Sequence, residues 1–212
     1  MIRNLKLLLL AAMATLAVSA VAATGAQAEK EFHTWSSETV ITSKADGTGK
    51  TSHHVIDAAG ASLTCGGFKS EISMYGYKTL FWLTSRSVSY ESCTFVGQTA
   101  SVNMNGCNYE YLANGWFGIA CPFGKEVQIS VPSPVCNLTI PPQTNKGTIS
   151  YTNINEKTAI TVSTAVPSLK YTATGAGCPI TGTYENGNYT SGNVIWNGEY
   201  ESNGLATAVW IE

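Results

Sequence analysis

Cys107-Asn-Tyr-Glu-Tyr-Leu-Ala-Asn-Gly-Trp-Phe-Gly-Ile-Ala-Cys121 is the stretch that decides the fold. Its centre, Ala113-Asn114-Gly115, predicts a three-residue hairpin loop, because glycine readily takes the left-handed conformation that closes such a turn. A two-residue Asn-Gly turn would shift the register by one residue and mix apolar and polar residues on each face. The three-residue loop instead gathers the core-forming residues on one face in three cross-strand pairs: Cys107–Cys121, Tyr109–Ile119 and Tyr111–Phe117.

Similar β-branched and aromatic runs occur on both sides of this hairpin, interrupted by Gly, Asn or Pro about every eight to twelve residues. The pattern predicts an all-β protein, an antiparallel β-sandwich or two small packed β-lobes, stapled by disulfides. The expected strands are 39–42, 54–57, 61–64, 68–74, 80–85, 100–104, 108–112, 116–121, 127–131, 136–140, 148–152, 159–166, 169–174, 182–185, 188–192 and 206–211.

Two further turns are predicted from local sequence. A four-residue loop at 154–157 would pair Tyr151 with Ile160 and Ile149 with Val162. An Asn-Gly turn within 185–188 would place Tyr184 opposite Tyr189.

The chain has six cysteines, an even number, which favours disulfides in an exported protein. No C-x-x-C pair and no neighbouring histidine is present to build a zinc site. The hairpin register predicts one bridge, and pairing of nearest neighbours predicts the other two: Cys107–Cys121, Cys65–Cys93 and Cys136–Cys178.

Residues 1–28 have the features of a cleavable signal peptide: a basic start with Arg3 and Lys6, an apolar run and an Ala26-Gln-Ala28 site. We expect cleavage before Glu29, a flexible lead at 29–38 and a secreted β domain at 39–212. No later stretch is long and apolar enough to span a bilayer, so no membrane span is expected after cleavage.

Loss of the signal leaves ten scattered lysines and arginines against 14 acidic residues, a net charge of −4. Nucleic-acid binding depends on clustered cations that displace counterions from phosphates. A nucleic-acid partner is therefore not expected.

Three candidate chemical motifs do not support a catalytic or metal role. The segment 47–51, Gly-Thr-Gly-Lys-Thr, lacks the first glycine of a phosphate-binding loop. His53 and His54 are adjacent and would point to opposite faces of a strand. Glu199 and Glu201 would share a face of a strand, with Cα atoms about 6.7 Å apart. Exposed neighbours, however, lack the unequal environments that separate the pKa values of a catalytic pair. We expect no enzyme activity, no metal and no cofactor.

The aromatic residues give the clearest indication of a binding site. Phe81 and Trp82 are expected in the core, within the apolar run 80–83. Trp116 should face away from the buried side of its hairpin, beside Leu112 and with Gly118 and Ala120 beyond it. An exposed indole over small neighbours would suit stacking on a sugar. Trp116 could instead belong to a second core.

Several segments resemble a family of exported, cysteine-containing, β-rich proteins of high-GC Gram-positive bacteria without an assigned activity. They are Val88-Ser-Tyr-Glu-Ser-Cys93, Asn105-Gly-Cys-Asn-Tyr-Glu-Tyr111, Cys121-Pro122, Leu169-Lys-Tyr-Thr172 up to Cys178, Gly182-Thr-Tyr184 and Gly187-Asn-Tyr189. The resemblance implies export, cysteine pairing and a β fold, and it assigns no functional residue.

Together these features favour a secreted, non-catalytic binding or envelope-surface protein of unknown extracellular ligand, with a glycan or cell-surface polymer as candidates. A carbohydrate-binding module is the sharpest version of this hypothesis. A carboxylate-dependent hydrolase and a pore-forming hairpin at 148–166 are the alternatives.

Overall fold

The computed structural model describes residues 30–34, 38–45, 54–75, 81–154, 156, 159–198 and 209–212. These residues form strands and turns and no helix, so none of them belongs to a helix that could cross a membrane. Every strand pair among them is antiparallel. The predicted antiparallel all-β class is confirmed.

The strands of the described residues form a two-stranded sheet, β1 with β15, and a 13-stranded sheet made of the others. Their bounds are β1 (Phe32–Thr34), β2 (Glu38–Ala45), β3 (His54–Ala58), β4 (Ala61–Tyr75), β5 (Trp82–Phe95), β6 (Gln98–Asn103), β7 (Asn108–Leu112), β8 (Trp116–Ala120), β9 (Val127–Pro132), β10 (Val135–Ile140), β11 (Gln143–Lys146), β12 (Thr148–Ile154), β13 (Ala159–Thr174), β14 (Gly182–Gly198) and β15 (Val209–Ile211).

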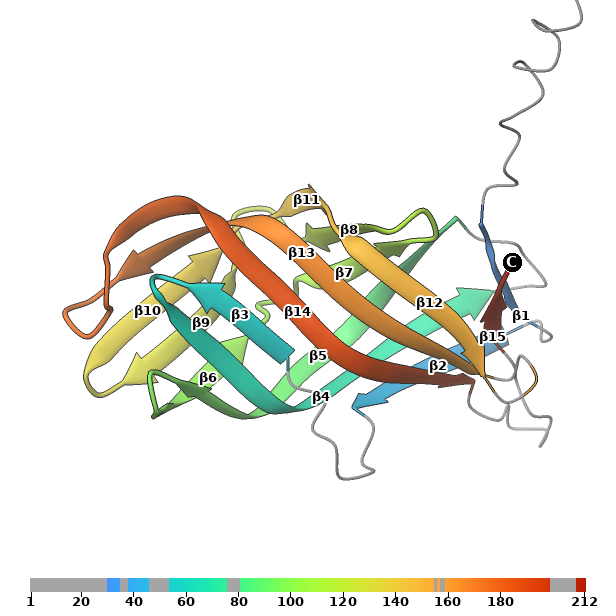
Figure 1. Cartoon of the computed structure of the whole chain (residues 1–212), viewed down its shortest axis with the longest axis horizontal. Helices are drawn as coiled ribbons and strands as arrows, with labels where there is room; N and C mark the ends of the chain where they lie inside the picture. The colour runs from blue at the N-terminus through green and yellow to red at the C-terminus, as the bar shows by residue number, and fades with distance from the viewer. Residues whose placement is uncertain are drawn as a thin grey trace, which may run out of the picture.

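The large sheet closes on itself. Following the pairings from β3 leads through β4, β5, β6, β9, β10, β13 and β14 and back to β3. Figure 1 shows these strands wrapping around a common interior. The two layers that an open sandwich would keep apart are therefore joined by continuous hydrogen bonding.

A second arm of the sheet branches from β5, where β5 pairs with β7, β7 with β8, and β8 with β11 (Figure 1). The side chain of Gln143 in β11 connects this arm to β13. Its Nε2 donates to the carbonyl of Lys170 at 3.0 Å, and its Oε1 accepts the Lys170 N–H at 2.8 Å. The outer face of β5, β7 and β8 is thus held on a sheet that is anchored on both sides.

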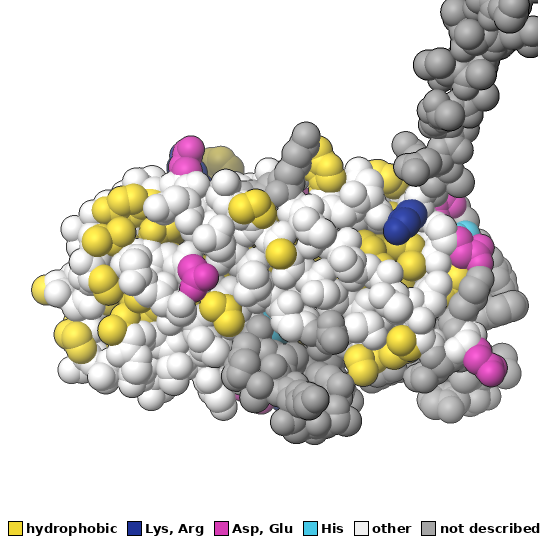
Figure 2. All heavy atoms as spheres, in the orientation of Figure 1, with side chains coloured by type: hydrophobic (Ala, Val, Ile, Leu, Met, Phe, Trp, Pro, Cys, Tyr) yellow, Lys and Arg dark blue, Asp and Glu magenta, His cyan; other side chains and the backbone are white. Residues whose placement is uncertain are grey.

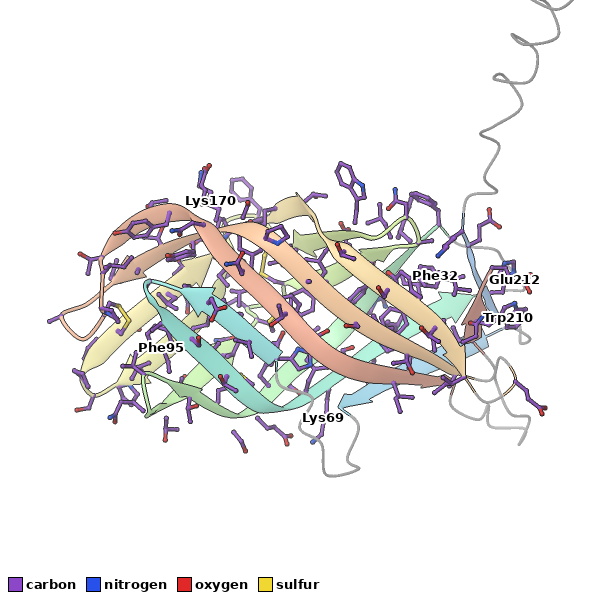
Figure 3. All side chains as sticks on the ribbon, viewed as in Figure 1. Phe32, Lys69, Phe95, Lys170, Trp210 and Glu212 are labelled. Atoms are coloured by element: carbon purple, nitrogen blue, oxygen red, sulfur yellow. A yellow bond between two sulfur atoms is a disulfide. The ribbon has the colours of Figure 1, made fainter. Side chains whose placement is uncertain are left out.

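The interior is filled by alternate residues of each strand, as the two-residue period of a strand requires. Its largest fully buried side chains are aromatic, and they come from strands spread along the whole chain: Phe32, Phe95, Phe117, Tyr171 and Trp196. Burial of a large apolar side chain contributes about 1.5–3 kcal/mol to the free energy of unfolding. Figure 3 shows Phe32 and Phe95 at opposite ends of this interior.

The hairpin prediction for residues 107–121 is confirmed. Tyr109 pairs with Ile119 and Tyr111 with Phe117, and Gly115 has a φ of 90°. All three predicted disulfides are present: Cys65–Cys93 between β4 and β5, Cys107–Cys121 at the base of the β7–β8 hairpin, and Cys136–Cys178 between β10 and the segment after β13.

The predicted turn at 185–188 is wrong, because β14 runs through it. Tyr184 pairs with Tyr171 and Gly187 with Leu169, while Tyr189 pairs with Val166. A Cβ atom on Gly187 would lie only 3.0 Å from the Leu169 carbonyl oxygen. Glycine is needed here because two strands approach each other closely, and not because the chain turns.

The predicted register of the β12–β13 hairpin is also wrong, by two residues. Tyr151 pairs with Val162, and Ile149 pairs with Thr164. An even shift keeps each side chain on its predicted face.

The flexible lead predicted at 29–38 is wrong for residues 32–34, which form β1. Phe32 is fully buried and packs edge-on against Tyr151, with ring centroids 5.0 Å apart. The N–H of Glu31 donates to the carbonyl of Glu212 at 2.7 Å, beside the β1–β15 pair. Burial of Phe32 explains the order of this segment, and Figure 3 shows it at the same end as Trp210 and Glu212.

Candidate functional site

Trp116 opens β8 directly after the hairpin loop and points outward, away from the buried side of the hairpin. Its side chain is 37% exposed, whereas its neighbour Phe117 is buried. The Trp116 backbone N–H donates to the Asn114 side-chain oxygen at 3.2 Å, which fixes the chain where the loop enters the strand. The predicted outward orientation of Trp116 is confirmed.

Trp82 was expected in the core, and this expectation is wrong. It is the first residue of β5 and is 62% exposed, while Leu83 beside it is 2% exposed. Adjacent residues of a strand point to opposite faces, so one apolar run supplies both a core residue and an outward tryptophan. Phe81, the residue before β5, packs partly buried against the core as expected.

The strand register aligns the two tryptophans across the sheet. Trp82 pairs with Leu112 of β7. Leu112 stands opposite Trp116, one step beyond the Tyr111–Phe117 pair. Paired residues of antiparallel strands project from the same face. Trp82, Leu112 and Trp116 therefore form one row on the outer face of β5, β7 and β8, which we call the tryptophan face.

A polar row lies directly beside this apolar row. Thr84 pairs with Glu110, Glu110 with Gly118, and Gly118 with Thr144 of β11. A Cβ atom on Gly118 would lie only 2.9 Å from Oε2 of Glu110. The missing side chain at Gly118 therefore leaves room for the Glu110 carboxylate to extend over β8. One step further along β5, Arg86 is exposed on the same face.

The interior contains a second group of chemically distinctive side chains. Nδ1 of His54 lies 2.8 Å from the Tyr189 hydroxyl, and its ring stacks on Phe68 with centroids 4.2 Å apart. Its Nε2 has no hydrogen-bond partner within the described part of the chain. The hydroxyls of Tyr90 and Tyr109 lie 2.5 Å apart.

Burial decides the protonation of this interior group. It lowers the pKa of His54 to about 4 and raises that of Tyr109 to about 12, because the charged forms lose water. Both side chains are neutral at pH 7. With His54 only 2% exposed, the group is closed to a substrate and acts as packed core.

A shallow hollow of about 320 Å³ opens beside the turn between β3 and β4. Its lining groups bond one another: the Ser62 hydroxyl donates to the Asp57 carboxylate. The Tyr171 hydroxyl accepts the Ala59 N–H at 2.7 Å and donates to Oδ1 of Asn186 at 3.1 Å. We assign no ligand to this hollow.

The other candidate residues do not form a site that the structure describes. Residues 47–51, His53, Glu199 and Glu201 lie outside the described residues. Within the described ranges, no group of three His, Cys, Asp or Glu side chains is placed to hold a metal ion.

No family model, curated protein or solved structure matches this chain. The tryptophan face itself therefore provides the indication of function. Its chemistry suits a ligand with flat apolar surfaces and hydroxyl groups at their edges. The indoles offer the flat surfaces, and Glu110 and Thr84 offer the hydrogen-bonding groups beside them.

Proposed function

We propose that this protein is a secreted, non-catalytic binding protein whose tryptophan face stacks on the sugar rings of a glycan or other cell-surface polymer. The observation that carries the proposal is the alignment of two exposed tryptophans, Trp82 and Trp116, in one row on a rigid sheet. Neighbouring exposed apolar residues on a soluble protein mark an interaction surface more often than isolated ones do.

The chemistry of a sugar ring matches this surface. Pyranose rings have C–H groups on their faces and hydroxyls around their edges. The C–H face packs on an indole without any charge, and the hydroxyls donate to acceptors such as the Glu110 carboxylate. Figure 2 shows only scattered charged side chains on this face of the molecule, among uncharged polar and hydrophobic ones. This composition favours a largely neutral ligand.

Export is the second element of the proposal. The three disulfides indicate that the protein matures in an oxidising environment. The basic and apolar features of residues 1–28 support secretion with cleavage before Glu29. N-terminal sequencing of the released protein should begin at Glu29, and a start far from this residue would contradict the processing site.

Affinity electrophoresis and pull-down with insoluble polysaccharides test the binding function. Trp82→Ala and Trp116→Ala should each weaken glycan binding by roughly tenfold or more, because each removes a large stacking surface. Phe123→Ala is the matched control: Phe123 is fully exposed but lies beyond the far end of β8. Unchanged glycan binding by both tryptophan variants would overturn the proposal.

A further inference from the structure

The row of the tryptophan face runs across the strands rather than along them. Trp82 lies on β5, Leu112 on β7 and Trp116 on β8. Neighbouring strands are spaced at about 4.8 Å, so two strand steps place the backbones at the two tryptophans about 10 Å apart. Leu112 between them is a smaller side chain and leaves the indoles as two separate plates.

This spacing matches a particular class of polysaccharide. In an extended β-1,4-linked chain of pyranoses, each ring is turned over relative to the one before it. Alternate rings therefore present the same face, and they are separated by one disaccharide length, which is close to two strand steps. An α-1,4-linked chain curves instead, so its rings do not lie on two plates of one surface.

We infer that the ligand of the tryptophan face is an extended β-1,4-linked glycan that lies across β5, β7 and β8, with alternate rings on Trp82 and Trp116. This inference rests on the proposed function and specifies its ligand class. The ring between them passes over Leu112. Three consecutive sugar units are the smallest ligand that engages both tryptophans.

The polar row offers hydrogen-bonding groups along one edge of the bound glycan chain. Glu110 extends over Gly118 toward β8, next to the position of a ring stacked on Trp116. A carboxylate accepts hydrogen bonds only, so it suits the hydroxyl donors of a neutral sugar and repels an anionic one. Thr84 provides a corresponding hydroxyl beside Trp82.

The twist of the sheet favours a single chain over a crystalline polymer surface. Adjacent strands are rotated by about 20–25°, and this rotation accumulates from β5 to β8. A free chain follows such a surface by small changes at each linkage. A flat crystal face does not follow it.

Isothermal titration calorimetry of the mature protein with sugar oligomers tests the inference. Two β-1,4-linked series are used, one of glucose and one of N-acetylglucosamine. Oligomers of α-1,4-linked glucose of equal length serve for comparison. Affinity should rise by about tenfold or more between disaccharide and trisaccharide in at least one β series, when the second indole is engaged. It should change little from tetrasaccharide to hexasaccharide, and the α series should bind weakly.

Variants separate this inference from the proposed function. Trp82→Ala should remove the gain beyond the disaccharide, Trp82→Phe should restore part of it, and Phe123→Ala should leave the whole series unchanged. Glu110→Gln should weaken every member of the series while keeping its length dependence. Binding that is equal for α and β chains, or independent of length, would overturn the ligand class and leave glycan binding intact. Absence of binding to any carbohydrate would overturn both.

Discussion

The two faces of the β7–β8 hairpin differ in role although both carry aromatic residues. The inner face holds Tyr109, Tyr111 and Phe117, which pack on one another with ring centroids 5.1–6.4 Å apart. The outer face holds Trp116, which is 37% exposed, and Leu112. Residue type does not separate these groups. Position along the strand does, because every second side chain enters the interior.

The comparison shows where mutation should affect stability and where it should affect binding. Inner residues contact side chains from the opposite wall, as Phe117 stacks on Tyr189 of β14 at 5.5 Å. Outer residues such as Trp82 and Trp116 are exposed instead. We expect changes on the inner face to lower the stability of the protein and changes on the outer face to leave it nearly unchanged.

Phe117→Ala should have the largest effect on stability. Removal of a fully buried aromatic ring leaves a cavity and costs about 3–5 kcal/mol of unfolding free energy. Urea denaturation followed by circular dichroism measures the change. A loss below about 1 kcal/mol would show that the inner face is not a close-packed core.

Replacement of both Cys107 and Cys121 by alanine should cost about 3 kcal/mol, because their bridge closes a short loop in the unfolded chain. The bridge also holds the register that separates the two faces. Thermal melts of the double variant, compared with the wild type in oxidising buffer, measure this effect. An unchanged melting temperature would mean that the loop alone sets the register.

His54 provides a test of how well the interior excludes water. Its pKa is about 4 in the folded protein, against about 6.5 in an unfolded chain. Between these values only the unfolded chain gains the proton, so stability is full above pH 6.5 and falls by roughly 3 kcal/mol as the pH drops to about 4. Urea titrations at several pH values should show this fall.

A matched pair of variants isolates the contribution of His54 to this pH dependence. His54→Phe should flatten the stability profile between pH 4 and 6.5. His33→Gln, at a half-buried position beside Trp210, should retain the fall. Equal profiles for the wild type and His54→Phe would indicate that water reaches the His54 ring.

Trp116→Ala should have the smallest effect on stability, under about 1 kcal/mol, because its site is on the surface. The same variant should lose glycan binding, so the contrast with Phe117→Ala reverses when binding rather than unfolding is measured. A stability loss as large as that of Phe117→Ala would place Trp116 in a second core.

Local sequence was sufficient to predict features that depend on near neighbours. The register at Tyr109 and Tyr111, the turn at Gly115 and the Cys107–Cys121 bridge all follow from one short segment. It was not sufficient where distant strands decide the outcome. The strands predicted at 61–64 and 68–74 are one strand, β4, because its partner β5 continues alongside it, with Cys65 paired to Cys93 and Gly67 to Glu91.

Bulges explain two other wrong predictions of strand bounds, in β13 and in β5. The strands predicted at 159–166 and 169–174 are one strand, β13, whose register shifts between Val166 and Leu169. Such an irregularity lets a strand continue through Pro167 and Ser168. A similar irregularity lies within β5, where Ser87 has a φ of 52°. The second half of this strand was not predicted. Closure of the sheet depends on these long strands.

The sequence predicted one of the two tryptophans of the candidate site. Trp116 was found because its hairpin could be aligned from a single turn. Trp82 was missed because the apolar run 80–83 suggested a strand buried on both faces. The alternation of Trp82, Leu83 and Thr84 was the available signal, with Leu83 facing inward. Alignment of the two tryptophans required the β5–β7 pairing, whose paired segments are separated by residues 85–109 along the chain.

Pairing of β1 with β15 has a consequence for the order in which the protein matures. Phe32 is made early, whereas its neighbour Trp196 and the partners of β1, Val209–Ile211, are made much later. Contacts between such distant residues form slowly, since a long loop must be closed first. A chain that stops before β15 lacks the strand that pairs with Phe32–Thr34. Closure of the interior around Phe32 therefore requires that both strands, far apart in the sequence, are present at the same time.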